Sequence, residues 1–213
     1  MSLSTDPRHS MSDNPLSANR SGEFSHGPEP LGLAAIGSDE VVEEFADVAR
    51  REYLASGIRV ALHPRLDLST EPRWARIIQT FGEDARLTGR LGAAYVRGFQ
   101  GRALGPDSAA TMVKHFPGGG PQKDGLAPHC ADGREQVDPG GQFEHHLTPF
   151  VEVLEAGAAQ VMPYYGMPVG AEYEEVGFAF NKGVVTGLLR ERLGFDGIVC
   201  TDFGVVTGPV HPA

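Results

Sequence analysis

The sequence predicts an α/β fold in which parallel strands alternate with helices. Three observations lead to this prediction. Apolar residues recur at helical spacing in four segments, and a short apolar run of strand length follows each segment. Glycines end three of the helical segments, at Gly57, Gly157 and Gly194. Helices and strands that alternate in this way are typical of parallel strands joined by helical crossovers.

The first unit of this alternation begins at Ser38. This serine is a favourable N-cap, and the two acidic residues after it suit the first turn of a helix. Apolar residues then recur at helical spacing over Val41–Tyr53. Because Gly57 favours a stop, we expect the helix to end there and Ile58–Leu62 to form a strand.

The remaining units follow the same order. The predicted helices lie at about 83–99, 147–154 and 184–193, and the strands after them at 109–113, 158–162 and 197–201. The N-terminal residues are rich in Ser, Asn, Gly and Pro, so we expect mainly loop there, with a strand stub at Ser2–Thr5.

Two architectures fit this alternation, an open doubly wound sheet and a (β/α)8 barrel. A complete barrel needs about 250 residues and eight strands, whereas this chain has 213 residues and fewer predicted strands. We therefore predict a partial TIM-type (β/α)8 barrel, with a loop-rich N-terminal segment at 1–35, the barrel domain at 36–206 and a tail at 207–213. An open barrel exposes apolar strand edges, which predicts self-association of the chain.

Composition argues against several classes of partner and site. A net charge of -10 disfavours nucleic acid as a partner. The sequence contains no apolar run of about 18 residues, so we expect no membrane partner. Two cysteines, Cys130 and Cys200, exclude a disulfide scaffold and a Cys-rich zinc module. The start of the chain lacks the pattern of a secretory signal, so we expect a cytoplasmic protein. The lone Trp74 is expected to pack in the core rather than to stack on a ligand.

Polar and ionisable side chains collect where the predicted strands end. They are Asp6, His63, Asp67, Lys114, His115, Tyr164, Tyr165 and Asp202. In parallel α/β proteins, ligands bind beyond the carboxyl ends of the strands. The set therefore predicts a polar binding site on one rim, although any one of these residues would serve equally well as a strand cap or as a partner of backbone groups.

The stretch Lys114–Pro121 allows three kinds of site. A phosphate loop is disfavoured because the lysine precedes the glycines and a proline follows them. A catalytic metal is disfavoured because no His-Glu-x-x-His occurs, and adjacent residues such as His145 and His146 cannot face one point on a helix. Lys114 and His115 can instead donate hydrogen bonds to sugar hydroxyls, with carboxylates as the acceptors.

Three stretches of the chain resemble a known family. Residues 66–84 contain Leu-Asp-Leu, Glu-Pro-Arg-Trp-Ala-Arg and Phe-Gly-Glu-Asp, residues 114–118 read Lys-His-Phe-Pro-Gly, and residues 194–204 read Gly-Phe-Asp-Gly-Ile-Val-Cys-Thr-Asp-Phe-Gly. Together they are similar to the barrel domain of glycoside hydrolase family 3, whose members are mostly β-glucosidases. The resemblance covers about residues 28–206 together with Thr5–His9, and it implies a barrel domain truncated at both ends.

The resemblance implies roles for several residues. Asp202 lies where the family has its nucleophilic carboxylate. Lys114, His115 and Arg76 lie where it has donors to the sugar in the first subsite, and Tyr165 matches an aromatic lining position.

Two positions need a further comment. Asp6 matches the carboxylate that holds the distal hydroxyls of that sugar in the family. Arg76 has an alternative role, an ion pair with Asp67 or Glu83 that only shapes the rim.

The activity implied by the resemblance is that of a retaining exo-β-glucosidase. Such an enzyme hydrolyses terminal non-reducing β-D-glucosyl residues of a small β-glucoside or oligosaccharide, and it needs no cofactor. The alternative is a non-catalytic truncated remnant, or one half of a split enzyme that only binds sugar and lacks its C-terminal half.

Several departures from the family pattern are visible. Phe203 stands where the family usually has Trp. The general acid/base usually lies on a second domain that we do not expect in this chain, so we expect little activity of this chain alone. A hexosaminidase branch carries that role on the loop after the Lys-His motif. This branch is disfavoured because Asp124 and His129 are not adjacent.

Overall fold

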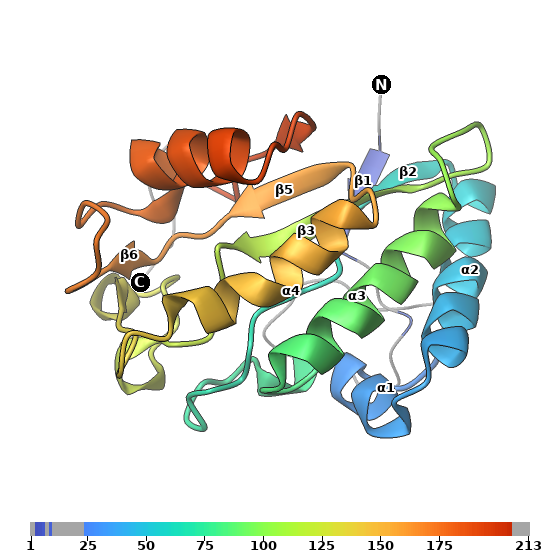
Figure 1. The fold of residues 1–213 in the computed structure, drawn as a ribbon. Coiled ribbons are helices and arrows are strands. Elements are labelled where there is room, and N and C mark those ends of the chain that lie inside the picture. Colours follow the sequence, from blue (N-terminus) through green and yellow to red (C-terminus); the bar gives the residue numbers. More distant parts are fainter. Residues whose placement is uncertain (1–2, 7–8, 10–23, 206–213) are drawn as a thin grey trace.

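The computed structural model describes residues 3–6, 9 and 24–205, and within these ranges the chain forms a five-stranded parallel sheet with helices packed on it (Figure 1). The strands are β1 (Leu3–Thr5), β2 (Ile58–Ala61), β3 (Ala110–Phe116), β5 (Gln160–Pro163) and β7 (Ile198–Val199). They lie side by side in chain order, and every neighbouring pair is parallel. A small second sheet pairs β4 (Glu135–Gln136) with β6 (Met167–Pro168). The predicted α/β class is confirmed.

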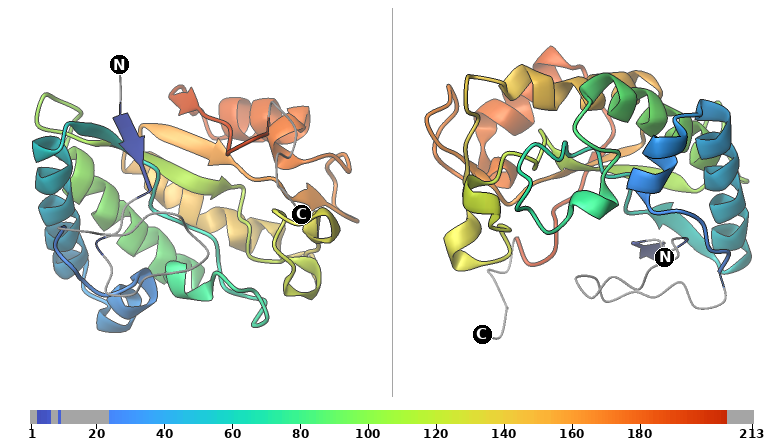
Figure 2. Two further views of the ribbon diagram at one scale, coloured as in Figure 1. Left: turned by 180° about the vertical axis from the view of Figure 1, so that it is seen from behind. Right: turned by 90° about the horizontal axis from the view of Figure 1, so that it is seen from below.

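The helices distinguish the two architectures that the alternation allowed. They are α1 (Pro30–Ile36), α2 (Asp39–Ala55), α3 (Ala85–Gln100), α4 (Phe143–Glu155) and a π-helical segment, Gly183–Arg192. Helices α3 and α4 lie in front of the sheet in Figure 1, with α2 beside α3, and the view from behind in Figure 2 shows the sheet in front of these three helices. A doubly wound sheet carries helices on both faces, so this arrangement in the described residues is that of a partial barrel.

Most boundaries differ from the prediction by a few residues, and three of the differences matter for the site. Helix α1 (Pro30–Ile36) forms where a loop was expected over residues 1–35. Strand β3 (Ala110–Phe116) extends beyond the predicted 109–113, so Lys114 and His115 lie within the strand and not after it. The last strand is limited to Ile198–Val199. The predicted tail at 207–213 and Ser2 of the strand stub lie outside the described residues.

Capping side chains set the starts of two helices. The Ser38 hydroxyl accepts a hydrogen bond from the backbone N–H of Val41 at 3.3 Å, as its predicted N-cap role requires. The carboxylate of Asp84 does the same for the N–H of Leu87 at 2.8 Å. Helix α3 therefore begins at Ala85, slightly later than the periodicity indicates.

Aromatic side chains fill the layer between the helices and the sheet. Phe116 of β3 and Phe150 of α4 pack edge to face with ring centroids 5.4 Å apart. Tyr95 and Phe99 of α3 stack at 5.1 Å. Trp74 is almost fully buried, which confirms the prediction that it packs in the core. The contact of Phe116 with Phe150 holds α4 against β3, the strand that carries Lys114 and His115, whereas the stacked pair lies within α3.

The glycine-rich loop after β3 passes very close to the loop after β2. A Cβ atom on Gly120 would lie 1.8 Å from the carbonyl oxygen of Leu68, a position that no side chain can occupy without moving the backbone. We expect Gly120→Ala to lower the free energy of unfolding by more than about 3 kcal/mol, measured by urea unfolding.

Gly187 is the matched control for this prediction. It lies in the helical segment Gly183–Arg192, and a Cβ atom there would meet no atom within 4 Å. Gly187→Ala should raise the free energy of unfolding by about 0.5–1 kcal/mol, because alanine favours a helix over glycine. Equal effects of the two substitutions would contradict the close approach at Gly120.

The two edge strands of the sheet are β1 and β7 in the described part of the chain. Leu3 on β1 is 50% exposed and Ile198 on β7 is 59% exposed. Apolar edges of this kind are templates for further pairing, and self-association of the isolated chain stays a prediction. No helix in the described ranges is long and apolar enough to cross a bilayer.

Candidate active site

Polar side chains from several strands meet at the carboxyl-end rim of the sheet. Asp6 follows β1, Lys114 and His115 lie near the end of β3, and Asp202 follows β7. All of them except Asp6 are almost fully buried, and Asp6 is half-buried. The rim therefore gathers charged groups where water is largely excluded, which is the setting in which charges act strongly on a bound ligand.

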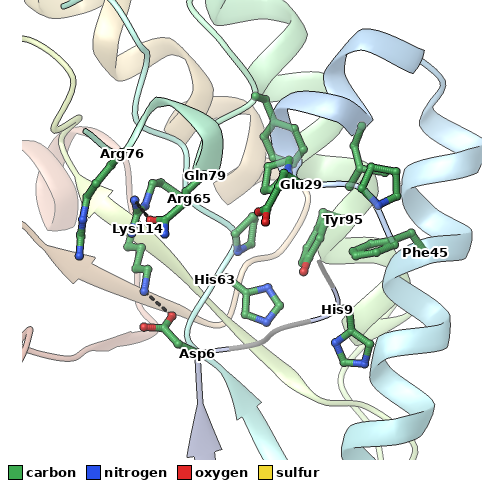
Figure 3. A pocket seen from close by; sticks show the side chains of 15 residues that line it. Asp6, His9, Glu29, Phe45, His63, Arg65, Arg76, Gln79, Tyr95 and Lys114 are labelled. Atoms are coloured by element: carbon green, nitrogen blue, oxygen red, sulfur yellow. Dashed lines mark hydrogen bonds and ion pairs between the residues drawn. The ribbon is translucent and has the colours of Figure 1, made fainter. Parts of the chain in front are cut away.

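Lys114 and Asp6 form an ion pair across the sheet. The Lys114 Nζ lies 2.5 Å from Oδ1 of Asp6 (Figure 3). Burial disfavours the charged form of Asp6, but the positive charges nearby, chiefly that of Lys114 and then that of Arg65, together outweigh this effect and lower the pKa of the carboxyl. Burial also lowers the pKa of Lys114, and Asp6 offsets this only in part. The pair offers one cationic donor and one anionic acceptor to a polar ligand.

His115 contacts Asp67, which lies in the loop after β2. The Nδ1 atom of His115 is 2.7 Å from Oδ2 of Asp67. Oδ1 of Asp67 accepts hydrogen bonds from the backbone N–H groups of Gly119 at 2.6 Å and of His115 at 3.2 Å. The Arg65 Nε lies 3.7 Å from Oδ2 of the same carboxylate. The N–H of Gly119 in the glycine-rich loop therefore donates a hydrogen bond to the carboxylate that contacts His115.

The carboxylate of Asp202 faces the other side of the histidine ring. Its Oδ2 lies 3.6 Å from Nε2 of His115, and its Oδ1 accepts a hydrogen bond from the backbone N–H of Phe203 at 2.7 Å. The hydroxyl of Tyr165 donates to the backbone carbonyl of Phe203. Burial and the negative charge of Asp202 raise the pKa of Tyr165, so this phenol stays protonated.

Arg76 is half-buried beside Lys114 (Figure 3). Among the residues that the structure describes, its guanidinium makes no ion pair with either Asp67 or Glu83, the partners of the alternative interpretation. Asp67 instead pairs with His115 and Arg65. Arg76 thus presents donors to the rim.

A cavity of about 110 Å³ opens next to the ion pair. Asp6, Arg76 and Lys114 line its polar end, and Leu33, Phe45, Phe81 and Tyr95 are part of its apolar wall. Asp202 is not among the lining residues. The site therefore consists of a pocket beside Asp6 and the carboxylate of Asp202 on the far side of His115.

His129 reaches this site from the long loop after β3, although the sequence singled it out only when a hexosaminidase motif was considered. Its ring lies 5.0 Å from that of Tyr165. Burial and the charge of Arg76 lower the pKa of His129 to about 4, so the ring is neutral near pH 7. Asp124 on the same loop is exposed and pairs with Arg73 at 3.3 Å.

In the described ranges, no three His, Cys, Asp or Glu side chains lie close enough together to hold a metal ion. The polar groups at the rim are cationic nitrogens, which donate hydrogen bonds, carboxylates, which accept them, and a neutral ring. Such a set fits the hydroxyl groups of a sugar, each of which both donates and accepts hydrogen bonds.

Residues 17–211 match the family model described as "Glycosyl hydrolase family 3 N terminal domain". The chain belongs to glycoside hydrolase family 3. Beta-glucosidase C of Emericella nidulans is 55% identical over 208 residues, which are 97% of this family 3 chain and 34% of the relative. The chain therefore spans about a third of the length of the relatives that it matches.

Solved structures of family 3 enzymes share the fold of this chain. A β-glucosidase from Listeria innocua in complex with isofagomine has a TM-score of 0.77 at 30% identity, over 86% of this chain and 25% of that one. The same enzyme has been solved with glucose and, as a mutant, with laminaribiose. A β-N-acetylglucosaminidase from a Paenibacillus species has a TM-score of 0.82 at 30% identity, over 95% of this chain and 36% of that one.

The family 3 fold brings most of the sequence-predicted site residues into contact range of one another. Lys114 contacts Asp6, and His115 lies next to Asp202. Tyr165 reaches the chain beside Asp202 through the carbonyl of Phe203. The sequence singled out Asp67 only as a rim residue or a partner of Arg76. Its contact with His115 depends on the tertiary structure.

Proposed function

We propose that this family 3 chain carries the sugar pocket and the nucleophile of a retaining exo-β-glucosidase. The observation that supports this most strongly is the position of Asp202. Its almost buried carboxylate lies 3.6 Å from His115, and Lys114, next to His115 in β3, pairs with Asp6. A carboxylate beside groups that bind sugar hydroxyls is what a double-displacement glycosidase requires.

In the proposed reaction, a carboxylate oxygen of Asp202 attacks the anomeric carbon of the terminal glucosyl residue. The bond to the leaving-group oxygen breaks, and that oxygen takes a proton from a general acid. Water then cleaves the glycosyl ester, and Asp202 is regenerated. We assign the general acid to a part of the enzyme that corresponds to the remaining two thirds of the relatives.

In the proposed pocket, the sugar is bound by charged groups of opposite sign. Lys114 and Arg76 donate hydrogen bonds to its hydroxyls, Asp6 accepts them, and Tyr165 lines the side of the site near Asp202. These bonds strengthen as positive charge develops on the sugar ring in the transition state.

A hybrid enzyme tests this proposal. In this hybrid, the present chain replaces the matching 208 residues of the Emericella nidulans relative. We expect the hybrid to hydrolyse 4-nitrophenyl β-glucoside faster than the β-xyloside and the β-N-acetylglucosaminide. The 213-residue chain alone should show little activity on the same panel.

Two outcomes would overturn the proposal. A preference of the hybrid for the N-acetylglucosaminide would assign the pocket to a different sugar. A correctly folded hybrid without activity, beside an active parent enzyme, would favour the alternative that this chain is a non-catalytic remnant.

A further inference from the structure

The side chain of Asp67 is fully buried, and both of its oxygens have fixed partners. Oδ1 faces two backbone N–H groups, those of Gly119 and His115, at 2.6 and 3.2 Å. Oδ2 faces Nδ1 of His115 at 2.7 Å. A backbone N–H group can only donate, so the atom opposite the two N–H groups must be an acceptor.

Asp67 is an anion in this environment. Burial alone would raise its pKa, but His115, Arg65 and the N–H of Gly119 lower it to about 2. A carboxylate at neutral pH has no proton to donate, so the hydrogen bond between Oδ2 and Nδ1 needs its proton on the histidine nitrogen.

The other ring nitrogen of His115 faces the site. Nε2 lies 3.6 Å from Oδ2 of Asp202, which is longer than a hydrogen bond. Burial lowers the pKa of His115 despite the nearby carboxylate of Asp67, which favours the neutral ring. A neutral imidazole with its proton on Nδ1 has a lone pair on Nε2.

We propose that Asp67 is a positioning residue that keeps the proton of His115 on Nδ1, so that Nε2 accepts a hydrogen bond from a sugar hydroxyl. The adjacent residues Lys114 and His115 then differ in role, because Lys114 donates and His115 accepts. This proposal differs from the expectation from the sequence, in which both residues donate. The inference rests on the proposed function only for the identity of the ligand.

The geometry around Asp67 makes Asp67→Asn an informative variant. The two backbone N–H groups require the amide oxygen of Asn at the Oδ1 position. The amide NH2 group must then take the Oδ2 position and donate to Nδ1 of His115. The ring proton is thereby moved to Nε2, and the lone pair facing the sugar is lost.

The position of the proton is measured by 15N magic-angle-spinning NMR of the hybrid enzyme labelled at histidine, with His115→Gln to assign the signals. We expect Nδ1 to be protonated and Nε2 unprotonated in the unmodified site, and the reverse in Asp67→Asn. A proton on Nε2 in the unmodified site would overturn the proposal. The unmodified spectrum decides this even where the variant fails to fold, and it needs no catalytic activity.

Kinetics with the four monodeoxy 4-nitrophenyl glucosides, modified at C2, C3, C4 or C6, test the hydrogen bond to the sugar. One deoxy position should lower kcat/KM of the hybrid about 10- to 100-fold through loss of the bond to Nε2. In Asp67→Asn that position should no longer matter, and the parent glucoside should lose a similar factor. Asp124→Asn, on an exposed residue paired with Arg73, is the control and should leave all four ratios unchanged.

The outcomes separate this inference from the proposed function. If the hybrid turns over no glucoside while Nδ1 carries the proton, the proposed function fails and the role of Asp67 stands. If all four deoxy penalties persist in Asp67→Asn, His115 does not accept a bond from the sugar, and the inference fails even though the enzyme is a glucosidase.

Discussion

Asp202→Asn should lower hydrolysis of 4-nitrophenyl β-glucoside by the hybrid enzyme at least about 10⁴-fold. The amide is nearly isosteric with the carboxylate, so the hydrogen bond from the N–H of Phe203 can persist while the nucleophile is lost. A measured loss below about tenfold would contradict the assignment of Asp202 as the nucleophile.

Formation of the covalent glycosyl-enzyme can be tested without a general acid if the substrate has an activated leaving group. A dinitrophenyl leaving group needs little protonation, so the 213-residue chain should be labelled slowly by 2,4-dinitrophenyl 2-deoxy-2-fluoro-β-glucoside. Cellobiose, with a poor leaving group, should hardly be hydrolysed by the same chain. Mass spectrometry should place the label on Asp202 and find none in Asp202→Asn.

Two results would revise this assignment. A label on Glu135 or Asp138 would transfer the nucleophile to another carboxylate. Brisk hydrolysis of cellobiose by the 213-residue chain would show that it holds a general acid/base of its own.

Lys114→Ala should lower kcat/KM of the hybrid by a factor that corresponds to about 2 kcal/mol or more of lost transition-state stabilisation. This is the scale of a lost charged hydrogen bond. The loss has two physical sources. The donor to the sugar disappears, and Asp6 keeps a negative charge without its partner at 2.5 Å. The measurement is steady-state kinetics on the aryl glucoside.

Lys123→Ala is the matched control for this prediction. Lys123 lies on the loop after β3, is exposed and pairs with Glu135 of β4, away from the ion pair at Asp6. Removing it should change kcat/KM by less than a factor of about two, because exposed ion pairs contribute little. Equal losses for the two lysine variants would exclude Lys114 from the sugar site.

The spacing of apolar residues in the sequence was sufficient to predict the long helices, but it did not predict the short helix α1 or the full length of strand β3. Helices α2, α3 and α4 bury apolar stripes several turns long, which a pattern reveals. Helix α1 has seven residues and includes Gly32 in a Pro- and Gly-rich stretch, so its composition indicates a loop. Strand β3 continues through Lys114 and His115 because the neighbouring strand β5 pairs with this part of it. No local pattern contains that information.

For the candidate site, the sequence indicated which residues lie at the rim but not which of them contact one another. Strand-end positions indicated Asp6, Lys114, His115 and Asp202 because carboxyl ends of parallel strands share one rim. The partners of these residues could not be predicted from the sequence. Asp67 and His115 are 48 residues apart in the chain and yet share a buried hydrogen bond. The contact of His129 with Tyr165 arises from the path of an irregular loop.

The strand order of the sheet has a consequence for synthesis on the ribosome. Because the strands lie side by side in chain order, each one finds its parallel neighbour already made when it emerges. The charged residues of the rim, in contrast, are far apart in the chain and must wait for their partners. Asp6 emerges 108 residues before Lys114, and Asp202 emerges last of the rim residues, so most of the sheet and its helices are made before the polar rim is complete.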